Sequence, residues 1–340
     1  MIKEAIKLLS QTKDLPQEVI YNSMLEIMEG IATPAQIAAF LMGLRLKGET
    51  SEEIAISARV MREKAIRISP RVDKMIDTCG TGGDGLHTFN ISTLVAFAIS
   101  AWGIGVAKHG NRSVSSSCGS ADLIESLGIN LELTPQVLER GIEEVGFGFL
   151  FAPRFHPAMK YATPVRKEIG IRTVFNILGP LANPAQPGYQ ILGVYSESLL
   201  EIIVQALKTL GLKSAIVLHS RDGMDEISIF SSTKAYILKD EKIEELEIIP
   251  EEFGIPRYNL NDIVVSSKQE AVEKAEKVLK GEEGADLDIV SLNAGWALYI
   301  LDEVDTPHKG FQEIKKLFKD GTVLKKVREI KDYYKNAISG

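Results

Sequence analysis

Residues 75–93 read MIDTCGTGGDGLHTFNIST, a short apolar run followed by a glycine cluster and the start of a helix. The apolar run predicts a buried strand over 72–78, and the pattern that ends at Gly103 predicts a helix over 92–102. Glycines let backbone N–H groups approach phosphate oxygens, and the free N–H groups of a helix start attract anions. This stretch therefore predicts a strand, an anion-binding turn and a helix in direct succession.

Strands and helices alternate along the chain beyond this stretch. Further strands are expected at 104–108, 147–151, 190–195, 215–219, 235–239 and 245–249, and helices at 121–127, 135–145, 197–210 and 270–279. This alternation predicts an α/β fold with a mostly parallel central sheet flanked by helices. Two more helices are expected to end the chain, and we interpret their Lys- and Arg-rich pattern over 311–336 as a solvated face.

The N-terminal part of the chain shows only helical patterns. Pro34 lies in the first turn of one expected helix, and Thr50 opens the capping-box pattern of another. We therefore expect a small all-helical domain over 1–67 and a larger α/β domain over 70–340. A helical stretch at 156–181 interrupts the strand series, and part of it is expected to return to the helical domain.

The composition is that of an ordinary globular protein, since 45% of the residues are hydrophobic and 25% are charged. A net charge of −7 argues against a protein whose main partner is nucleic acid, where a basic surface is expected. The longest nearly apolar stretch, 94–107, is shorter than the ~20 residues that span a bilayer, and the N-terminus lacks the features of a signal peptide. We therefore expect a cytoplasmic protein with no membrane partner, in which Cys79 and Cys118 are reduced and not bonded to each other.

The glycine cluster allows two interpretations. The pattern GxGxxG over 80–85, between a strand and a helix, is typical of dinucleotide-binding folds. Against this, Asp84 would repel a pyrophosphate unless a cation intervenes, and the next strand ends in Lys108 where such folds place an acid. A phosphorylated sugar held together with a metal ion fits better, because Ser92 and Thr93 add hydroxyls at the helix start.

A second polar loop follows the next expected strand. Residues 108–120 read KHGNRSVSSSCGS, which combines two cations, two glycines and many hydroxyls. Cationic side chains and hydroxyls are the groups that bind phosphate oxygens in proteins. This loop therefore predicts a second set of anion ligands.

Taken together, these segments resemble the anthranilate phosphoribosyltransferase family. The matching motifs lie, in order, at 77–85, 88–93, 108–116, 164–166, 172–181 and 225–226, and they extend over essentially the whole chain. The resemblance implies a small helical domain joined to a larger α/β domain of the nucleoside phosphorylase and phosphoribosyltransferase type, with dimerisation through the helical domain. It also implies transfer of the phosphoribosyl group of phosphoribosyl pyrophosphate to the amine of anthranilate, a step of tryptophan biosynthesis that requires Mg²⁺.

The resemblance assigns the site residues by motif. The phosphoribosyl pyrophosphate ligands would be Gly80, Gly83, Asp84, Thr88, Asn90, Ile91, Ser92, Thr93, Lys108, His109, Gly110, Asn111, Arg112, Ser113, Val114, Ser115, Ser116 and Ser120. Magnesium would be held by Ser92, Asp225 and Glu226, and anthranilate would contact Gly80, Asn111 and Arg166. No residue stands out as an obligatory general base, although His109 and His156 are candidates. Catalysis is therefore expected to rest on positioning and electrostatics.

Two of these assignments can be examined by their chemistry. Adjacent residues of a strand point to opposite faces, so Asp225 and Glu226 are expected in a loop after the strand over 215–219, or else they serve two different ions. Arg166 can bind the carboxylate of anthranilate with its fork of donors. The alternative for Arg166 is an exposed ion pair on a helix that has further charges, such as Lys167.

Two other functions remain open at this point. A pyrimidine nucleoside phosphorylase-like enzyme would need a lysine soon after the glycine cluster, where Leu86 and His87 stand. A non-catalytic nucleic-acid-binding protein of the same fold would have lost the metal-binding acids and gained a basic face. Asp225, Glu226 and the net charge of −7 count against that second alternative.

Overall fold

Strand β1 (Met75–Gly80) lies inside a seven-stranded sheet in the computed structural model, which describes residues 1–112 and 118–339. The strand order is β3-β2-β1-β4-β5-β6-β7. The other strands are β2 (Gly105–Gly110), β3 (Phe147–Phe151), β4 (Tyr189–Gly193), β5 (Ser214–Ser220), β6 (Thr233–Lys239) and β7 (Lys242–Ile248). Strands β1 to β5 are parallel to one another, while β6 and β7 add an antiparallel hairpin at one edge. The predicted α/β fold with a mostly parallel sheet is thus confirmed.

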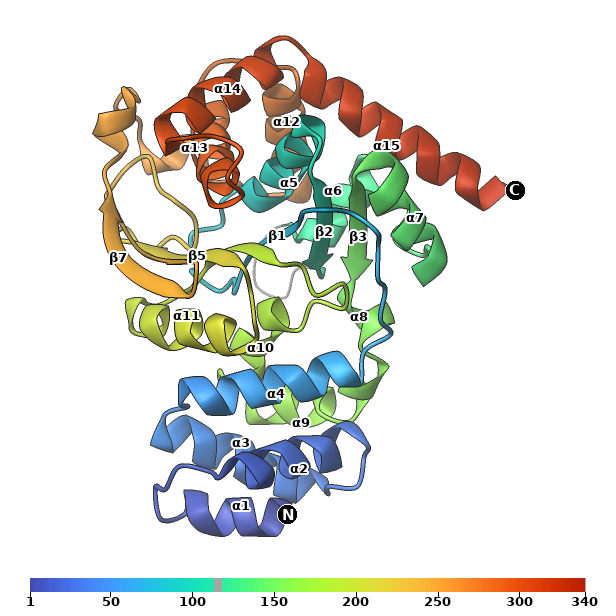
Figure 1. The fold of residues 1–340 in the computed structure, drawn as a ribbon, viewed down its shortest axis with the longest axis vertical. Helices are drawn as coiled ribbons and strands as arrows, with labels where there is room; N and C mark the ends of the chain where they lie inside the picture. The colour runs from blue at the N-terminus through green and yellow to red at the C-terminus, as the bar shows by residue number, and fades with distance from the viewer. Residues whose placement is uncertain (113–117, 340) are drawn as a thin grey trace.

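Helices cover both faces of this sheet, and they are shown in Figure 1. The helices of this part of the chain are α5 (Ile91–Trp102), α6 (Ser120–Ser126), α7 (Pro135–Val145), α10 (Phe175–Leu181), α11 (Leu200–Thr209), α12 (Lys268–Leu279), α13 (Ala285–Ile300), α14 (Pro307–Lys319) and α15 (Thr322–Ser339). Alternate residues of a strand serve the two faces. Ile216 and Leu218 of β5 lie in the core that includes α5 and α13, while Ala215 and Val217 lie in the core that includes α11.

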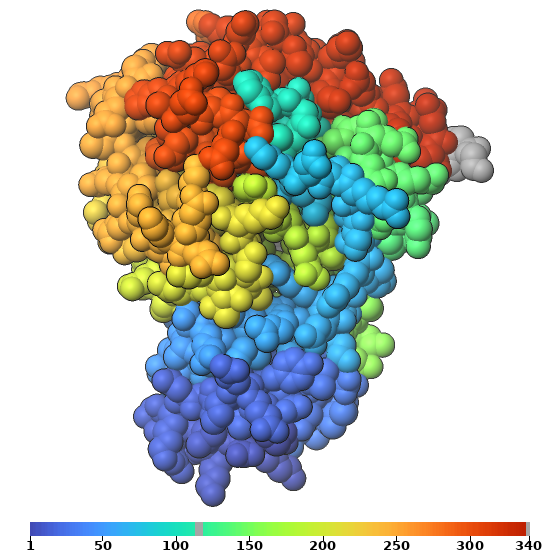
Figure 2. Space-filling view, viewed as in Figure 1, coloured from blue at the N-terminus to red at the C-terminus, as the bar shows by residue number. Residues whose placement is uncertain are grey.

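A separate group of helices forms the narrow lower end of the molecule in Figures 1 and 2, and it lies below the sheet in Figure 1. It contains α1 (Ile2–Leu9), α2 (Gln17–Met28), α3 (Pro34–Lys47) and α4 (Ser51–Glu63). The predicted capping box is present, because the Thr50 hydroxyl accepts from the Glu53 backbone N–H and the Glu53 carboxylate accepts from Thr50. Helix α9 (Thr163–Ile169) packs against α3, and α10 packs against α4.

Some expected elements differ from those in the structure. The helical stretch at 156–181 is broken into the 3-10 turn η1 (Pro157–Lys160) and helices α9 and α10, and it is preceded by the short α8 (Ala152–Phe155). Helix α13 has no counterpart among the expected elements. It is buried on almost all sides, so it lacks the polar face that gives a helix its periodic pattern.

Two further expectations concern cysteine and the membrane. Cys79 and Cys118 are both buried, and no disulfide joins them, as predicted. Within residues 1–112 and 118–339, no helix has the length and apolar character needed to cross a bilayer.

Candidate active site

The glycine cluster meets a loop from a distant part of the chain at the carboxyl ends of β1 and β4. The Gly82 backbone N–H donates a hydrogen bond of 2.8 Å to Oδ2 of Asp225. A Cβ atom at Gly80 would lie 2.3 Å from that oxygen, and one at Gly193 would lie 1.6 Å from the Asp225 carbonyl oxygen. Glycine is therefore required at both strand ends, because the Asp225 loop rests directly on them.

Asp225 and Glu226 lie in the connection between β5 and β6, as predicted, and both are half-buried. Burial and the nearby Asp84 carboxylate raise the pKa of Asp225 to about 7. Burial and Asp225 raise the pKa of Glu226 well above its usual range, while Lys108 opposes this. Carboxylates gathered in this way form a place that a cation would stabilise.

The donor atoms at this place suit magnesium. No three His, Cys, Asp or Glu side chains of the described residues form a complete metal site by themselves. Magnesium, however, is usually bound by one or two carboxylates together with substrate phosphate oxygens and water. Asp225, Glu226 and the hydroxyl of Ser92 therefore fit a Mg²⁺ ion that shares its coordination with a bound phosphate ligand.

Lys108 lies beneath this site and connects β1 to the start of α5. Its side chain is buried, and Nζ donates to the carbonyl oxygen of Thr78 and, at 3.1 Å, to Oγ of Ser92. Burial lowers the pKa of Lys108, while Asp77 opposes that shift. The Thr78 hydroxyl donates to the Ser92 carbonyl at 2.8 Å, so the first turn of α5 is fixed to the end of β1.

Two polar atoms at the start of α5 are buried and make no hydrogen bond to any described residue. They are Oδ1 of Asn90, the N-cap residue of α5, and Oγ1 of Thr93 in its first turn. The amide nitrogen of Asn90 donates to the Cys118 carbonyl at 2.9 Å, which joins α5 to the loop after β2. Unpaired buried acceptors and hydroxyls beside free helix N–H groups are suited to a polar ligand.

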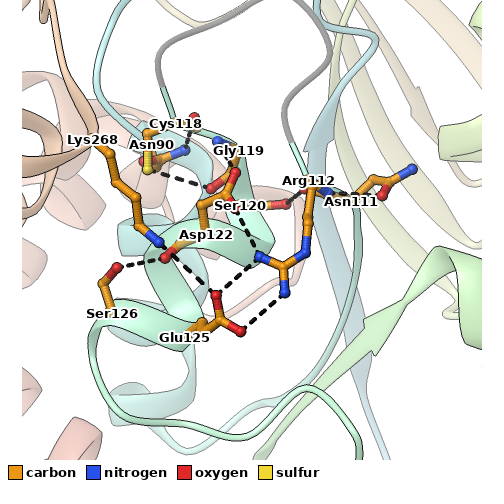
Figure 3. Close-up of polar contacts among 10 residues, drawn as sticks. All are labelled: Asn90, Asn111, Arg112, Cys118, Gly119, Ser120, Asp122, Glu125, Ser126 and Lys268. Atoms are coloured by element: carbon orange, nitrogen blue, oxygen red, sulfur yellow. Dashed lines mark hydrogen bonds and ion pairs between the residues drawn. The ribbon is translucent and has the colours of Figure 1, made fainter.

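The loop after β2 is described up to Arg112 and again from Cys118. The predicted ligands Ser113, Val114, Ser115 and Ser116 lie outside the described residues. Gly110 approaches Ser120 so closely that a Cβ atom would lie 2.4 Å from its Oγ, and that hydroxyl donates to the Asn111 carbonyl at 3.3 Å. Figure 3 shows Arg112 directed at α6. Its guanidinium donates to Glu125 at 2.9 and 3.0 Å and to Asp122 at 3.0 Å, so this expected phosphate ligand is paired with acids here.

The remaining expected ligands of the glycine loop lie along the same rim. Thr88 forms a single antiparallel bridge with Val264, and Ile91 begins α5 as a buried residue. The carbonyl oxygen of Gly83 accepts a hydrogen bond from the guanidinium of Arg172. The Arg172 guanidinium carbon also lies 4.2 Å from the ring centre of Tyr195. Arg172 therefore joins the α9–α10 connection to the glycine loop, a role that the sequence interpretation did not assign.

Arg166 lies on α9 and is half-buried. Its guanidinium carbon lies 5.4 Å from the ring centre of Phe175, and burial lowers its pKa. Among the described residues no ion pair joins Arg166 to a carboxylate, so the alternative of an exposed ion pair is not observed. A half-buried guanidinium without an acidic partner can donate hydrogen bonds to the carboxylate of a ligand.

The two candidate bases, His109 and His156, lie side by side with ring centres 5.0 Å apart. Nδ1 of His109 lies 3.1 Å from the Gly179 carbonyl oxygen, and Nε2 of each ring has no partner among the described residues. Burial lowers the pKa of His109 to about 3 and that of His156 to about 4. Both rings are therefore neutral at pH 7, and both are poor proton acceptors.

We expect these two histidines to make the protein sensitive to acid. A histidine in the unfolded chain has a pKa of about 6.5, so below that pH the unfolded state binds protons while the buried rings of the folded state stay neutral. The free energy of unfolding therefore falls as the pH decreases toward 4. His156→Phe removes one such ring. Between pH 7.5 and pH 5 both proteins should lose stability. The loss in free energy of unfolding should be smaller in the His156→Phe variant than in the unchanged protein, by about 2 kcal/mol.

Urea denaturation at the two pH values measures this difference. The exposed His308, replaced by Gln, serves as the control and should keep the pH dependence of the unchanged protein. An equal pH dependence in the protein with Phe at position 156 would contradict the assignment of His156 as a buried neutral ring.

Comparison with known proteins gives the family. Residues 72–324 match the model of the glycosyl transferase family a/b domain, and residues 3–65 match that of its helical bundle domain. The anthranilate phosphoribosyltransferase of Acetivibrio thermocellus is 46% identical over 339 residues, which cover 100% of this chain and 98% of that protein. The chain belongs to the anthranilate phosphoribosyltransferase family.

Solved structures of the anthranilate phosphoribosyltransferase family have the same fold. The enzyme from Thermus thermophilus superposes with a TM-score of 0.91 and 38% identity, covering 97% of this chain and 99% of that one. The enzyme from Saccharomyces cerevisiae, solved in complex with PRPP and Mg, superposes with a TM-score of 0.90 and 25% identity, covering 98% of each chain. The family predicted from the sequence motifs is therefore confirmed.

Proposed function

We propose that this protein transfers the phosphoribosyl group of phosphoribosyl pyrophosphate to the amine of anthranilate, giving N-(5-phosphoribosyl)anthranilate and pyrophosphate in tryptophan biosynthesis. The observation that best supports this function is the contact of the Asp225 loop with the glycine cluster beside the start of α5. It places acidic metal ligands next to backbone N–H groups that suit phosphate oxygens. Membership of the family and the ligands of the yeast enzyme support the same reaction.

The donor is proposed to lie along the glycine loop, the start of α5 and the loop after β2. Breaking the bond between C1 and pyrophosphate places positive charge on the sugar and negative charge on the leaving group. Bound Mg²⁺ supplies charge neutralisation for the pyrophosphate. Asp225 and Glu226 would hold that ion and Ser92 would add a hydroxyl, while the backbone N–H groups that follow Gly82 in the glycine loop and those at the helix start orient the phosphates.

The acceptor is proposed to lie between Gly80, Asn111 and Arg166. Arg166 holds the carboxylate of anthranilate with two donors, which directs the amine at the sugar. The neutral rings of His109 and His156 are too weakly basic to remove a proton efficiently at pH 7. Catalysis then depends on positioning of the two substrates and on charge stabilisation.

The direct test mixes the protein with phosphoribosyl pyrophosphate, Mg²⁺ and anthranilate. Anthranilate fluorescence should disappear while pyrophosphate is released in equal amount, and omission of any one component should stop both. A reaction of uridine or thymidine with inorganic phosphate would instead favour the nucleoside phosphorylase alternative. Retardation of DNA at physiological salt, without any transfer activity, would favour a nucleic-acid-binding protein.

We also propose a cytoplasmic homodimer that forms through the helical domain. Three large apolar side chains on or beside α3 are exposed: Ile31 (64%), Met42 (40%) and Leu46 (76%). Met42 and Leu46 are four residues apart, so they lie on the same side of the helix. Exposed apolar side chains gathered in this way are typical of a surface that is covered by a partner.

Leu46→Glu is expected to separate such a dimer, because it places a charge in an apolar contact. Light scattering at micromolar concentration should give twice the chain mass for the unchanged protein and a single chain mass for the variant. Ile249→Glu is the control, since Ile249 is also exposed but lies after β7, away from the helical domain. A single chain mass for the unchanged protein would refute the dimer.

A further inference from the structure

The backbone that follows the acidic pair is held by one side chain from the C-terminal half of the chain. Ile227 comes directly after Glu226 and is fully buried. Its N–H donates to Oδ1 of Asn293 at 2.9 Å, and its carbonyl oxygen accepts from Nδ2 of Asn293 at 2.9 Å. A single amide thus satisfies both backbone groups of Ile227, as a neighbouring strand would.

Asn293 is a polar residue in an almost entirely buried helix. It lies in the middle of α13, fully buried among apolar side chains of that helix. A buried amide destabilises a protein unless its polar atoms are bonded, and here Nδ2 makes a further bond of 2.9 Å to the Ile289 carbonyl. The two bonds to Ile227 therefore stabilise one particular conformation of the chain after Glu226.

The same helix is joined to the other parts of the proposed metal site. Helix α13 packs against α5, whose first turn contains Ser92. The hydroxyl of Ser220, the last residue of β5, also donates to the Glu226 carbonyl oxygen at 3.0 Å. The backbone of Glu226 and Ile227 is thus held both by β5 and by α13, and Asn293 is a contact that joins it to the helical layer containing Ser92.

We propose that Asn293 is a positioning residue for the metal-binding acids. By fixing Ile227, it sets the direction in which Asp225 and Glu226 present their carboxylates to Ser92 and to the glycine loop. The inference rests on the proposed function, because it assumes that these acids hold Mg²⁺ together with a phosphate ligand. Residues that orient metal ligands in this way typically change metal affinity or activity by 10- to 100-fold when they are replaced.

The test uses Asn293→Ser in the full-length protein. A serine hydroxyl in a helix can bond the carbonyl four residues back, so this variant keeps a bond to Ile289 but cannot reach Ile227. Asn293→Ala is measured beside it, so that the result does not depend on the folding of one variant. Leu298→Ala is the control, because it leaves a cavity beside the same helix but keeps the hydrogen bonds between Asn293 and Ile227.

Two readouts are needed. The first is binding of Mn²⁺ in the presence of pyrophosphate, followed by the EPR signal of free Mn²⁺, which requires no catalysis. The second is the Mg²⁺ concentration that gives half-maximal transfer activity, measured together with the KM for anthranilate. Both substitutions of Asn293 should weaken Mn²⁺ binding and raise the Mg²⁺ requirement about tenfold, with the KM for anthranilate unchanged and kcat largely recovered at high Mg²⁺.

Leu298→Ala should leave both metal readouts as in the unchanged protein. Equal shifts in the Leu298 and Asn293 variants, or no shift in either, would overturn the positioning role. The proposed function is tested separately by the unchanged protein. If that protein binds Mn²⁺ with pyrophosphate but transfers nothing to anthranilate, the function fails while the binding comparison still decides the role of Asn293.

Discussion

Replacing Asp225 by Asn together with Glu226 by Gln is expected to lower kcat/KM by about a thousandfold or more, because charge stabilisation of the leaving group is among the largest contributions to catalysis. The protein should stay folded. Burial and the Asp84 carboxylate raise the pKa of Asp225, and burial and Asp225 raise the pKa of Glu226, so removal of the two charges relieves an unfavourable interaction. The melting temperature of the double variant should therefore equal or exceed that of the unchanged protein.

Steady-state kinetics over a range of Mg²⁺ concentrations and thermal denaturation measure the two effects. Glu251→Gln with Glu252→Gln is the matched control, because it removes two adjacent charges from an exposed turn, η3 (Pro250–Phe253). That control should keep normal activity. Full activity of the double variant with an unchanged Mg²⁺ requirement would show that the metal is held elsewhere.

Local patterns in the sequence predict most elements of this fold. The capping box at Thr50 and the helix that ends at Gly103 are visible within a few residues of chain, and both are present. Successive residues of a central strand are buried in one or the other of the two cores, so such strands are continuous apolar runs that can be recognised in the sequence. Helix α13 escapes such analysis, because a helix buried on nearly every side has no polar stripe.

The candidate site follows from the sequence only in part. Each loop shows its polar character locally, but the contact between Gly82 and Asp225 joins residues 143 positions apart. No spacing rule predicts that contact, and only the resemblance to a family brought the two segments together. The need for glycine at position 193 is equally invisible in the sequence, because it arises from the backbone of Asp225, which packs directly against Gly193.

Other features of the site depend on partners that a sequence does not reveal. Arg112 was expected to bind phosphate, but its guanidinium is paired with Asp122 and Glu125. Arg172 lies within a recognised motif, and its position on Gly83 becomes apparent only in the structure. The clearest sequence signal for Arg172 is that it is the one charged residue of the motif over 172–181.

Arg166→Ala is expected to reduce kcat/KM for anthranilate by about ten- to a hundredfold or somewhat more. A charge-assisted contact with a carboxylate is worth roughly 1.5–3 kcal/mol, and ~1.4 kcal/mol corresponds to a factor of ten. The structure supports a ligand role, since Arg166 lies half-buried over Phe175 and pairs with no carboxylate of the described residues. The kcat/KM for phosphoribosyl pyrophosphate should change much less, because its phosphates are assigned to other loops.

Kinetics with each substrate varied in turn distinguish three roles for Arg166. A loss confined to anthranilate identifies the guanidinium as the carboxylate ligand. Equal losses for both substrates would mean that Arg166 instead maintains the packing of α9, which carries it, on the helical domain. An unchanged enzyme would assign it to the solvated surface. Lys167→Ala is the control, because it removes an exposed cation from the same helix. It should leave kcat/KM for both substrates unchanged, which would show that the loss of one positive charge does not by itself explain the effect of Arg166→Ala.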